Sequence, residues 1–409
     1  MVYHVCYAGI GKLSAQGFNI GKRAVDISAH IKEGMPKRKL CFVYGTRPEI
    51  IKLSPVIKLC RKRKIPFFCI HTGQHWSYGL DRIFFKELDL PTPEYRLSIK
   101  SKAPFRQGDH TGRMLIAVED IMLKEMPYCV IVQGDTNSAL AGALTAEKIS
   151  TTESYTGFHI KVAHVEAGLR SYDRTMPEET NRFIADHLSD YLFVPTAKEG
   201  KILRKEGVPN SKIFKTGNTI VDTVKQRVAI AEKESLILDN LGLSKGPYVL
   251  LTLHRQENVD SKKIFQNILK GLRGVINELK LPVIFPMHPR TAKMLDKFRL
   301  KIPRDIKVVD PLGFLDFLWL EANAALVMTD SGGVQEEACT LKVGCVTLRD
   351  NTERPETVEV GSNIIAGTNP VNIVKACKKM LRTKKNWRNP LGDGKASERI
   401  LKVLMRYNR

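Results

Sequence analysis

Four side chains able to exchange protons stand just after apolar runs of the sequence or near helix-like segments. Asp135 follows VIVQG, Glu166 follows VAHV, Glu178 lies in TMPEETNR, and His254 follows LLTL. Carboxylates and imidazoles are the commonest general acids and bases of enzymes. The residue types therefore predict acid–base catalysis, provided that the fold brings them together.

Each of these residues also has an ordinary structural explanation. Asp135 could cap a helix, His254 could be a satisfied core histidine, and the two glutamates could pair with Arg170 or Arg182. A shared cleft explains all four together better, with Arg170, Arg182 and Arg255 keeping the acids ionised or poised for proton transfer. We therefore predict that the three carboxylates and the imidazole are catalytic.

The segment TDSGGVQEEA predicts the binding of a phosphorylated ligand. Ser331, Gly332 and Gly333 form a side-chain-poor turn before a helix that we expect to begin near Val334. Exposed backbone N–H groups and the Ser331 hydroxyl would hold a diphosphate. Glu337, about one turn into the helix, would accept hydrogen bonds from two ribose hydroxyls. The alternative is an ordinary glycine turn whose acidic residues favour the helix dipole.

The segment YGTRPEIIKLSP predicts a second anion contact. It follows the first strong apolar run and places Arg47 and Lys52 around the start of a helix, where an anion is favoured. The alternative is a surface loop with two solvated cations. His71 and His75 in HTGQH lack the acid of an H-E-x-x-H metal motif. We therefore predict no metal site and no cofactor.

Short β-rich runs alternate with stretches of helical spacing from Leu40 onward. The first series is LCFVYG, PFFCIHTG, CVIVQGD, KVAHVEAG and YLFVPT, and a second series begins after FKTGNTIVD with PYVLLTLH. This alternation predicts parallel sheets with helices on both faces. We predict an α/β protein with two Rossmann-like domains, residues 39–215 and 216–387, facing a central cleft. Such sheets bind ligands at the carboxyl ends of their strands, where the polar clusters fall.

The charge, cysteine and apolar content of the chain argue against several classes of partner. The net charge is +22, but the basic residues are spread along the chain without aromatic-interleaved or zinc-finger motifs. We therefore expect solvated helix faces and no nucleic-acid partner. The 8 cysteines include no C-x-x-C pair, which indicates reduced thiols in the cytoplasm. No stretch reaches the ~18 apolar residues of a membrane span.

Residues 1–38 differ from the rest because they carry glycines and isolated basic residues without sustained periodicity. One interpretation is that translation starts at Met35, just ahead of the first strand-like run. The other is a genuine basic arm that packs on a neighbour. A peptide spanning Ala24 to Lys32 in the native protein would exclude the first interpretation.

Taken together, the motifs resemble one known family, the non-hydrolysing UDP-N-acetylglucosamine 2-epimerases. The resemblance runs from about Lys39 to the C-terminus and rests on YGTRPEIIKLSP, HTGQH, GDTNSALAGAL, HVEAGLRS, MPEETNR, GNTIVD, LTLHRQEN, HPRT, TDSGGVQEEA and NTERPETVEVGSN. It implies a GT-B fold, a homodimer, and a C-terminal helix at about 388–409 that packs back on the first domain. It also implies interconversion of UDP-GlcNAc and UDP-ManNAc without NAD or an obligatory metal.

The same resemblance, matched position by position, implies roles for individual residues. The catalytic set would be Asp135, Glu166, Glu178 and His254. Nucleotide and substrate contacts would come from Arg47, Lys52, Arg170, Arg182, His288, Ser331, Gly332, Gly333 and Glu337. Gln74 and His75 resemble residues near an allosteric substrate site of some bacterial members.

The expected reaction is elimination and re-addition of UDP through a 2-acetamidoglucal intermediate, which would supply ManNAc-type sugars for surface polysaccharide or glycan synthesis. Three alternatives remain open. A hydrolysing relative would release ManNAc and UDP, and a GT-B glycosyltransferase would transfer the sugar of UDP-GlcNAc to an acceptor. A non-enzymatic nucleotide sensor or nucleic-acid-binding protein would not need so many acids in one cleft.

Overall fold

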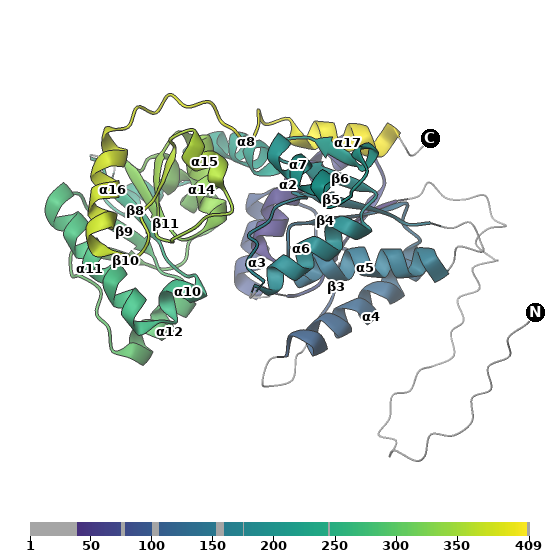
Figure 1. Cartoon of the computed structure of the whole chain (residues 1–409), viewed down its shortest axis with the longest axis horizontal. Coiled ribbons are helices and arrows are strands. Elements are labelled where there is room, and N and C mark those ends of the chain that lie inside the picture. Colours follow the sequence, from purple (N-terminus) through teal and green to yellow (C-terminus); the bar gives the residue numbers. More distant parts are fainter. Residues whose placement is uncertain are drawn as a thin grey trace, which may run out of the picture. The chain divides into compact units, whose positions relative to one another are not determined.

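The computed structural model describes residues 39–74, 78–99, 106–152, 159–174, 176–243 and 246–406 (Figure 1). Both interpretations of residues 1–38, and the assignment of His75, lie outside these described residues. The described chain contains two sheets in which every strand pairing is parallel. Together with the flanking helices, they confirm the predicted α/β class.

The first sheet has seven strands in the order β3-β2-β1-β4-β5-β6-β7. These strands are β1 (Leu40–Tyr44), β2 (Phe67–His71), β3 (Tyr95–Arg96), β4 (Cys129–Gln133), β5 (Lys161–Val165), β6 (Tyr191–Val194) and β7 (Ile213–Lys215). The central strands are buried along their whole length, which is why LCFVY and CVIVQ read as continuous apolar runs rather than alternating ones.

The second sheet has six strands in the order β10-β9-β8-β11-β12-β13. These strands are β8 (Val249–Thr252), β9 (Val283–Pro286), β10 (Ile306–Val309), β11 (Leu326–Thr329), β12 (Gly344–Thr347) and β13 (Asn363–Ile365). The short strands β3, β7 and β13 are not among the predicted runs, because two or three residues give too little pattern to recognise.

Helices connect the strands of both sheets. Those of the first sheet are α2 (Arg47–Lys62), α3 (Tyr78–Glu87), α4 (Gln107–Glu125), α5 (Asn137–Thr152), α6 (Pro177–Leu188), α7 (Ala197–Lys205) and the 3₁₀ turn η2 (Asn210–Lys212). Those that follow are α8 (Thr219–Glu234), α9 (Ile237–Asn240), α10 (Gln256–Val259), α11 (Lys262–Leu279), α12 (Pro289–Phe298), α13 (Phe314–Ala322), α14 (Gly332–Leu341), α15 (Pro355–Glu359), α16 (Pro370–Arg382) and α17 (Ala396–Arg406). None of the helices among the described residues is both long and apolar enough to cross a membrane.

Helix α8 follows the first sheet and packs on helices from both halves of the chain. It contacts α2 as well as α13 and α14. The C-terminal helix α17 lies against α8 and α2 (Figure 1). Its first turn is held by Asp222 of α8, whose carboxylate accepts hydrogen bonds from the backbone N–H groups of Ala396 and Ser397 at 3.1 and 2.8 Å. Helix α17 is therefore held against α8 and α2.

The strand orders place one switch point in each sheet. Strands β1 and β4 are neighbours in the first sheet, and β8 and β11 are neighbours in the second, with the helical connections leaving in opposite directions. A crevice opens at the carboxyl ends of such strand pairs. The turns at these ends carry Arg47, Asp135, His254 and Ser331. The division into domains at 215 and 216 stays a proposal.

Candidate functional site

The turn after β1 is fixed by one buried carboxylate. Glu49 Oε2 accepts hydrogen bonds from the backbone N–H groups of Gly45 and Thr46 at 2.9 and 2.8 Å, and Oε1 accepts from Thr136 Oγ1 at 2.7 Å. Burial raises the pKa of Glu49 to about 7 despite these donors. Gly45 is required here, because a Cβ would lie 2.0 Å from Thr72 Oγ1. Glu49 thus joins the turns after β1 and β4.

Asp135 lies in the turn after β4 and does not cap helix α5. Thr136 does so, because its Oγ1 accepts from the backbone N–H of Ala139 at 3.0 Å. The Asp135 side chain is 30% exposed, and Oδ2 pairs with Arg182 Nη2 at 2.5 Å. Its Oδ1 receives no hydrogen bond from the part of the chain that the structure describes. One carboxylate oxygen is therefore free for a substrate.

The buried His164 contacts the turn that carries Asp135. His164 Nε2 lies 2.8 Å from the Gly134 carbonyl oxygen and Nδ1 lies 2.7 Å from Asp186 Oδ1. Both neighbours are acceptors, so the ring carries both protons. Burial opposes this charge, but Asp186 outweighs it and the pKa of His164 is raised. Arg170 Nη1 approaches Asp186 Oδ2 at 2.7 Å from the other side.

We expect His164→Asn to cost about 3 kcal/mol of stability at mildly acidic pH, because Asp186 loses a buried charge partner. The folded pKa of His164 is raised above its usual value of 6.5. Its contribution is therefore complete below about pH 6.5 and is lost as pH rises through the folded pKa. Urea unfolding between about pH 5 and pH 9 measures this difference.

The control for this prediction is the same substitution at exposed His187, which should change the unfolding free energy by less than about 0.5 kcal/mol. A wild-type-minus-variant difference that grows with pH would contradict the charged state assigned to His164.

Glu166 is the centre of a buried ion cluster. Its Oε2 lies 2.5 Å from Lys52 Nζ and accepts from Gln133 Nε2 at 2.8 Å, while Oε1 accepts from Arg354 Nη2 at 2.6 Å. Glu336 contacts the same two cations, with 2.9 Å between its Oε2 and Lys52 Nζ. We call Lys52, Glu166, Glu336 and Arg354 the Glu166 cluster. It ties the end of β5 to α14 and to the loop after β12.

Charge and backbone geometry both mark Glu166 as unusual. Burial alone would raise the pKa of Glu166, but the charges of Lys52 and Arg354 outweigh it and lower the pKa. Its backbone φ is +68°, a left-handed conformation that costs energy for a residue with a side chain. Strain of this kind persists where surrounding contacts enforce it, and it is concentrated at functional sites.

Two histidines stand side by side at the carboxyl ends of β8 and β9. The rings of His254 and His288 lie 5.5 Å apart, and burial lowers the pKa of both. Both imidazoles are therefore neutral near pH 7. His288 Nδ1 accepts from the backbone N–H of Arg290 at 3.1 Å, so its proton sits on Nε2. His254 Nδ1 lies 3.3 Å from Asp330 Oδ1.

Helix α14 begins directly with the two glycines. We expected its start near Val334, but it begins at Gly332 with Ser331 as the N-cap residue. A Cβ added at Gly332 or Gly333 would come no closer than 3.8 Å to any other atom. Packing within the chain therefore does not require these glycines. Their missing side chains leave room for a ligand to approach the helix N-terminus.

A hollow of about 210 Å³ adjoins this helix start. Five of the residues predicted to contact the nucleotide line it: Arg47, Lys52, Ser331, Gly333 and Glu337. Aromatic rings of Phe84, Phe314 and Phe317 form its apolar wall. Burial and then the charge of Glu336 raise the pKa of Glu337 to about 8. The hollow thus combines an anion site with an apolar wall, as a nucleotide requires.

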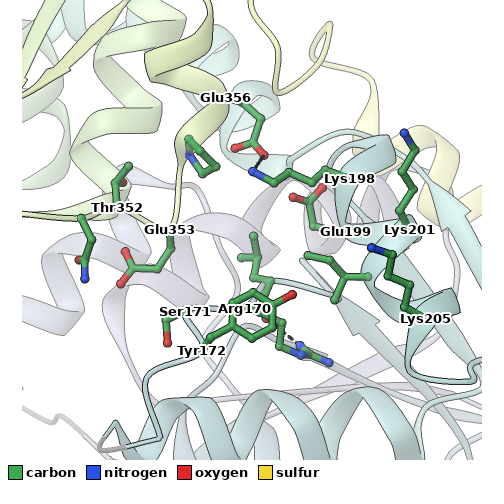
Figure 2. Close-up of a pocket in the computed structure, with 14 residues that line it drawn as sticks. Arg170, Ser171, Tyr172, Lys198, Glu199, Lys201, Lys205, Thr352, Glu353 and Glu356 are labelled. Atoms are coloured by element: carbon green, nitrogen blue, oxygen red, sulfur yellow. Dashed lines mark hydrogen bonds and ion pairs between the residues drawn. The ribbon is translucent and has the colours of Figure 1, made fainter.

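A larger hollow of about 490 Å³ is lined by residues of α7, of the segment after β5 and of the loop after β12 (Figure 2). Lys198 of α7 meets Glu356 of α15 across it, with 3.8 Å between Nζ and Oε1 (Figure 2). Of the predicted site residues, it contains only Arg170. The Arg170 guanidinium already pairs with Asp186 and Glu206 at 2.7 and 2.6 Å. The smaller hollow is lined by five residues predicted to contact the nucleotide, and one of them, Lys52, also pairs with Glu166. We therefore assign the nucleotide to the smaller hollow.

The remaining predicted residues differ in the contacts that they make. Glu178 is half-buried in the first turn of α6, and no hydrogen bond or ion pair reaches it from the described residues. Arg182 bridges Asp135 and Glu179, so neither predicted arginine pairs with Glu166 or Glu178. The Gln74 amide oxygen accepts from the Ser138 hydroxyl at 2.9 Å.

Sequence reasoning missed three residues of the site. Arg354 and Glu336 complete the Glu166 cluster, and Asp330 accepts from the backbone N–H of His254 at 3.0 Å and holds its ring. Each lies inside a motif already quoted, NTERPE or TDSGGVQEEA. In the sequence, Glu336 adjoins Glu337 and Asp330 adjoins the glycine turn, but charge alone did not show which acids face inward.

The chain is similar to known proteins over most of its length. The family model described as UDP-N-acetylglucosamine 2-epimerase matches residues 58–405. A UDP-N-acetylglucosamine 2-epimerase of Methanocaldococcus jannaschii is 52% identical over 372 residues, covering 90% of this chain and 98% of the relative. The chain belongs to the UDP-N-acetylglucosamine 2-epimerase family. A UDP-2,3-diacetamido-2,3-dideoxy-D-glucuronate 2-epimerase of Pseudomonas aeruginosa is 38% identical, covering 90% of this chain and 99% of that one.

Solved structures of this epimerase family share the fold. The M. jannaschii UDP-GlcNAc 2-epimerase in complex with UDP-GlcNAc and UDP matches with a TM-score of 0.83 and 52% identity, covering 90% of this chain and 99% of that one. The Neisseria meningitidis enzyme bound to UDP-GlcNAc matches with a TM-score of 0.80 and 28% identity, covering 90% and 100%. The predicted GT-B fold is therefore confirmed.

Proposed function

We propose that the protein interconverts UDP-N-acetylglucosamine and UDP-N-acetylmannosamine by inverting C2 without net hydrolysis. The observation that carries this proposal is the position of Lys52. It lines the hollow with Ser331 and Gly333, and it also bonds Glu166 and Glu336 at 2.5 and 2.9 Å. A nucleotide diphosphate in the hollow would therefore lie next to the acids. The names of the relatives support the same substrate.

The chemistry explains why a tight diphosphate site is needed. The C2 proton of the sugar has no carbonyl group on a neighbouring carbon, so its direct removal would be slow. Breaking the bond between C1 and the diphosphate oxygen creates positive character at C1 and makes the C2 proton labile. Groups that stabilise the charge developing on UDP therefore lower the barrier. The α14 N-terminus, Arg47 and the Nε2–H of neutral His288 suit this role.

The three predicted acids differ in their bonding partners, and we assign their roles from this difference. Glu166 has both carboxylate oxygens bound to cations and a lowered pKa, which suits the stabilisation of positive charge at C1 more than proton uptake. Asp135 has a free Oδ1, and Glu178 has no bonding partner among the described residues. We assign the two proton transfers, one on each face of C2, to Asp135 and Glu178. UDP adds back to the resulting 2-acetamidoglucal to complete the inversion.

Incubation with UDP-GlcNAc in heavy water tests this function. We expect NMR spectroscopy to show UDP-ManNAc, with deuterium at C2 of both nucleotide sugars and UDP present in less than molar equivalence to product. Turnover without deuterium at C2 would overturn the proposal. Release of one UDP for each free ManNAc would instead identify the hydrolysing reaction. Heat-denatured protein serves as the control for spontaneous breakdown.

A further inference from the structure

A second buried carboxyl group lies behind Glu337, on the side away from the hollow. Glu321 is in the last turn of α13 and is fully buried. Helices α13 and α14, which carry Glu321 and Glu337, contribute Leu320, Val334 and Ala338 to one buried apolar cluster. No hydrogen-bond donor from the described residues reaches either of the Glu321 carboxyl oxygens. A buried polar group without a donor is costly, so its state needs a physical account.

The polar group beside Glu321 is the carboxyl group of Glu337, within hydrogen-bonding reach. Two ionised carboxylates at about 4 Å would repel each other by about 4 kcal/mol even in a partly solvated site. The pair therefore keeps a proton, as acid pairs in enzymes do. A proton between them also supplies the donor that Glu321 lacks.

The surroundings place that proton on Glu321. Burial, and then the charge of Glu337, raise the pKa of Glu321 well above its usual range. Glu337 lines the hollow, where burial and then the charge of Glu336 of α14 raise its pKa to about 8, while the charge of Lys52 of α2 opposes them. Above about pH 8, Glu337 is therefore ionised and the proton of the pair stays on Glu321. Among the described residues, the buried thiol of Cys345 on β12 is a further titratable neighbour of Glu321; burial raises the pKa of this thiol, so it stays neutral.

We propose that Glu321 is a positioning residue that, as a neutral carboxylic acid, donates a hydrogen bond to Glu337 and aims the Glu337 carboxylate at the ribose hydroxyls of the bound nucleotide. The inference rests on the proposed function, because the nucleotide assignment of the hollow comes from there. One Glu337 oxygen is taken by the Glu321 proton, and the other is left to accept from the diol. A ligand without the 2′-hydroxyl would lose part of this contact.

Calorimetric titration with UDP and with 2′-deoxy-UDP at about pH 9, above the pKa of about 8 of Glu337, tests the inference in three proteins. Glu321→Gln keeps a donor of nearly the same shape, whereas Glu321→Met fills the space without a donor. We expect Glu321→Gln to bind UDP within about 3-fold of wild type and to keep its preference over 2′-deoxy-UDP. Glu321→Met should bind UDP about 10-fold or more weakly and lose most of that preference, because a hydrogen bond to a charged group is removed.

A purely space-filling role predicts the opposite order, with Glu321→Met equal to or better than Glu321→Gln, and that result would overturn the inference. The infrared difference spectrum between wild type and Glu321→Gln, recorded without ligand at the same pH of about 9, gives a second readout. It should show the carbonyl band of one neutral carboxylic acid in the wild type alone, and its absence would also overturn the inference. Failure of the wild type to bind UDP would instead count against the proposed function, whatever the infrared result. Thermal unfolding establishes that both variants are folded.

Discussion

Glu178→Gln and Asp135→Asn are each expected to lower the turnover of UDP-GlcNAc by about 10²-fold or more while UDP still binds. Both changes replace a carboxylate by an amide of the same shape, which cannot take up a proton. Neither residue lines the hollow assigned to the nucleotide. The amide oxygen introduced by Asp135→Asn would still accept a hydrogen bond from Arg182, so the turn after β4 should keep its position. NMR turnover assays and calorimetry with UDP separate the two effects.

The matched control is Glu232→Gln, an exposed glutamate on α8 outside the proposed site. Its turnover should equal that of the wild type. Near-normal turnover of both Asp135→Asn and Glu178→Gln would mean that the proton transfers belong to other groups. Loss of UDP binding together with turnover would show instead that these acids position the nucleotide.

The positions of the strand-end residues could be predicted because of one topological rule. All strands of a parallel sheet point the same way, so residues that follow different strands meet at one edge. Asp135 follows β4, Glu166 follows β5, His254 lies just beyond β8, and Ser331 lies just beyond β11, as the apolar runs indicated. Alternating strands and helices are a strong pattern, and the α/β class followed from it directly.

The partners of these residues could not be predicted, because they depend on packing between distant parts of the chain. Arg354 is 188 residues from Glu166, and no local pattern connects the two. Glu336 and Glu337 are neighbours in one helix, yet Glu336 joins the Glu166 cluster while Glu337 lines the hollow. Arg170 is predicted to contact the substrate, and its pairing with Asp186 and Glu206 is a further contact that the sequence did not indicate.

The same dependence on packing explains why Thr136, and not Asp135, caps helix α5. Asp135 and Thr136 are both good N-cap residues, and the sequence does not choose between them. The choice is made by Glu49, which accepts a hydrogen bond from Thr136 Oγ1, and by Arg182, which binds the Asp135 carboxylate. Asp135 is thereby left outside the helix, where its second oxygen stays free for chemistry.

Arg354→Met is expected to destabilise the protein by about 3–5 kcal/mol, because it leaves buried charges without a partner. Glu166 and Glu336 would then share a single cation, Lys52, in a region where both carboxylates are almost fully buried. Urea unfolding measures the loss. The matched control is Arg399→Met, which breaks an exposed pair with Asp393 and should cost about 0–1 kcal/mol.

A second substitution distinguishes buried charge from lost packing. If the cost of Arg354→Met is mainly electrostatic, adding Glu336→Gln should recover stability, because one buried negative charge is removed with the positive one. If the cost comes from the missing guanidinium volume, the double variant should be no more stable than Arg354→Met. The expected result is recovery of a substantial part of the loss, and additive destabilisation would contradict the ionic account of the cluster.

The pH dependence of turnover tests whether the Glu166 cluster is required for catalysis. Glu166 has a lowered pKa in the intact cluster, so it stays ionised well below neutral pH and is protonated only as pH falls through that value. Removing Arg354 weakens this effect and raises the pKa of Glu166, so the acid limb of the turnover profile should move to higher pH. Arg354→Lys restores one charge without the two-pronged contact to Glu166 and Glu336, and should move the limb less. An acid limb that stays in place in both variants would mean that ionised Glu166 is not required for the reaction.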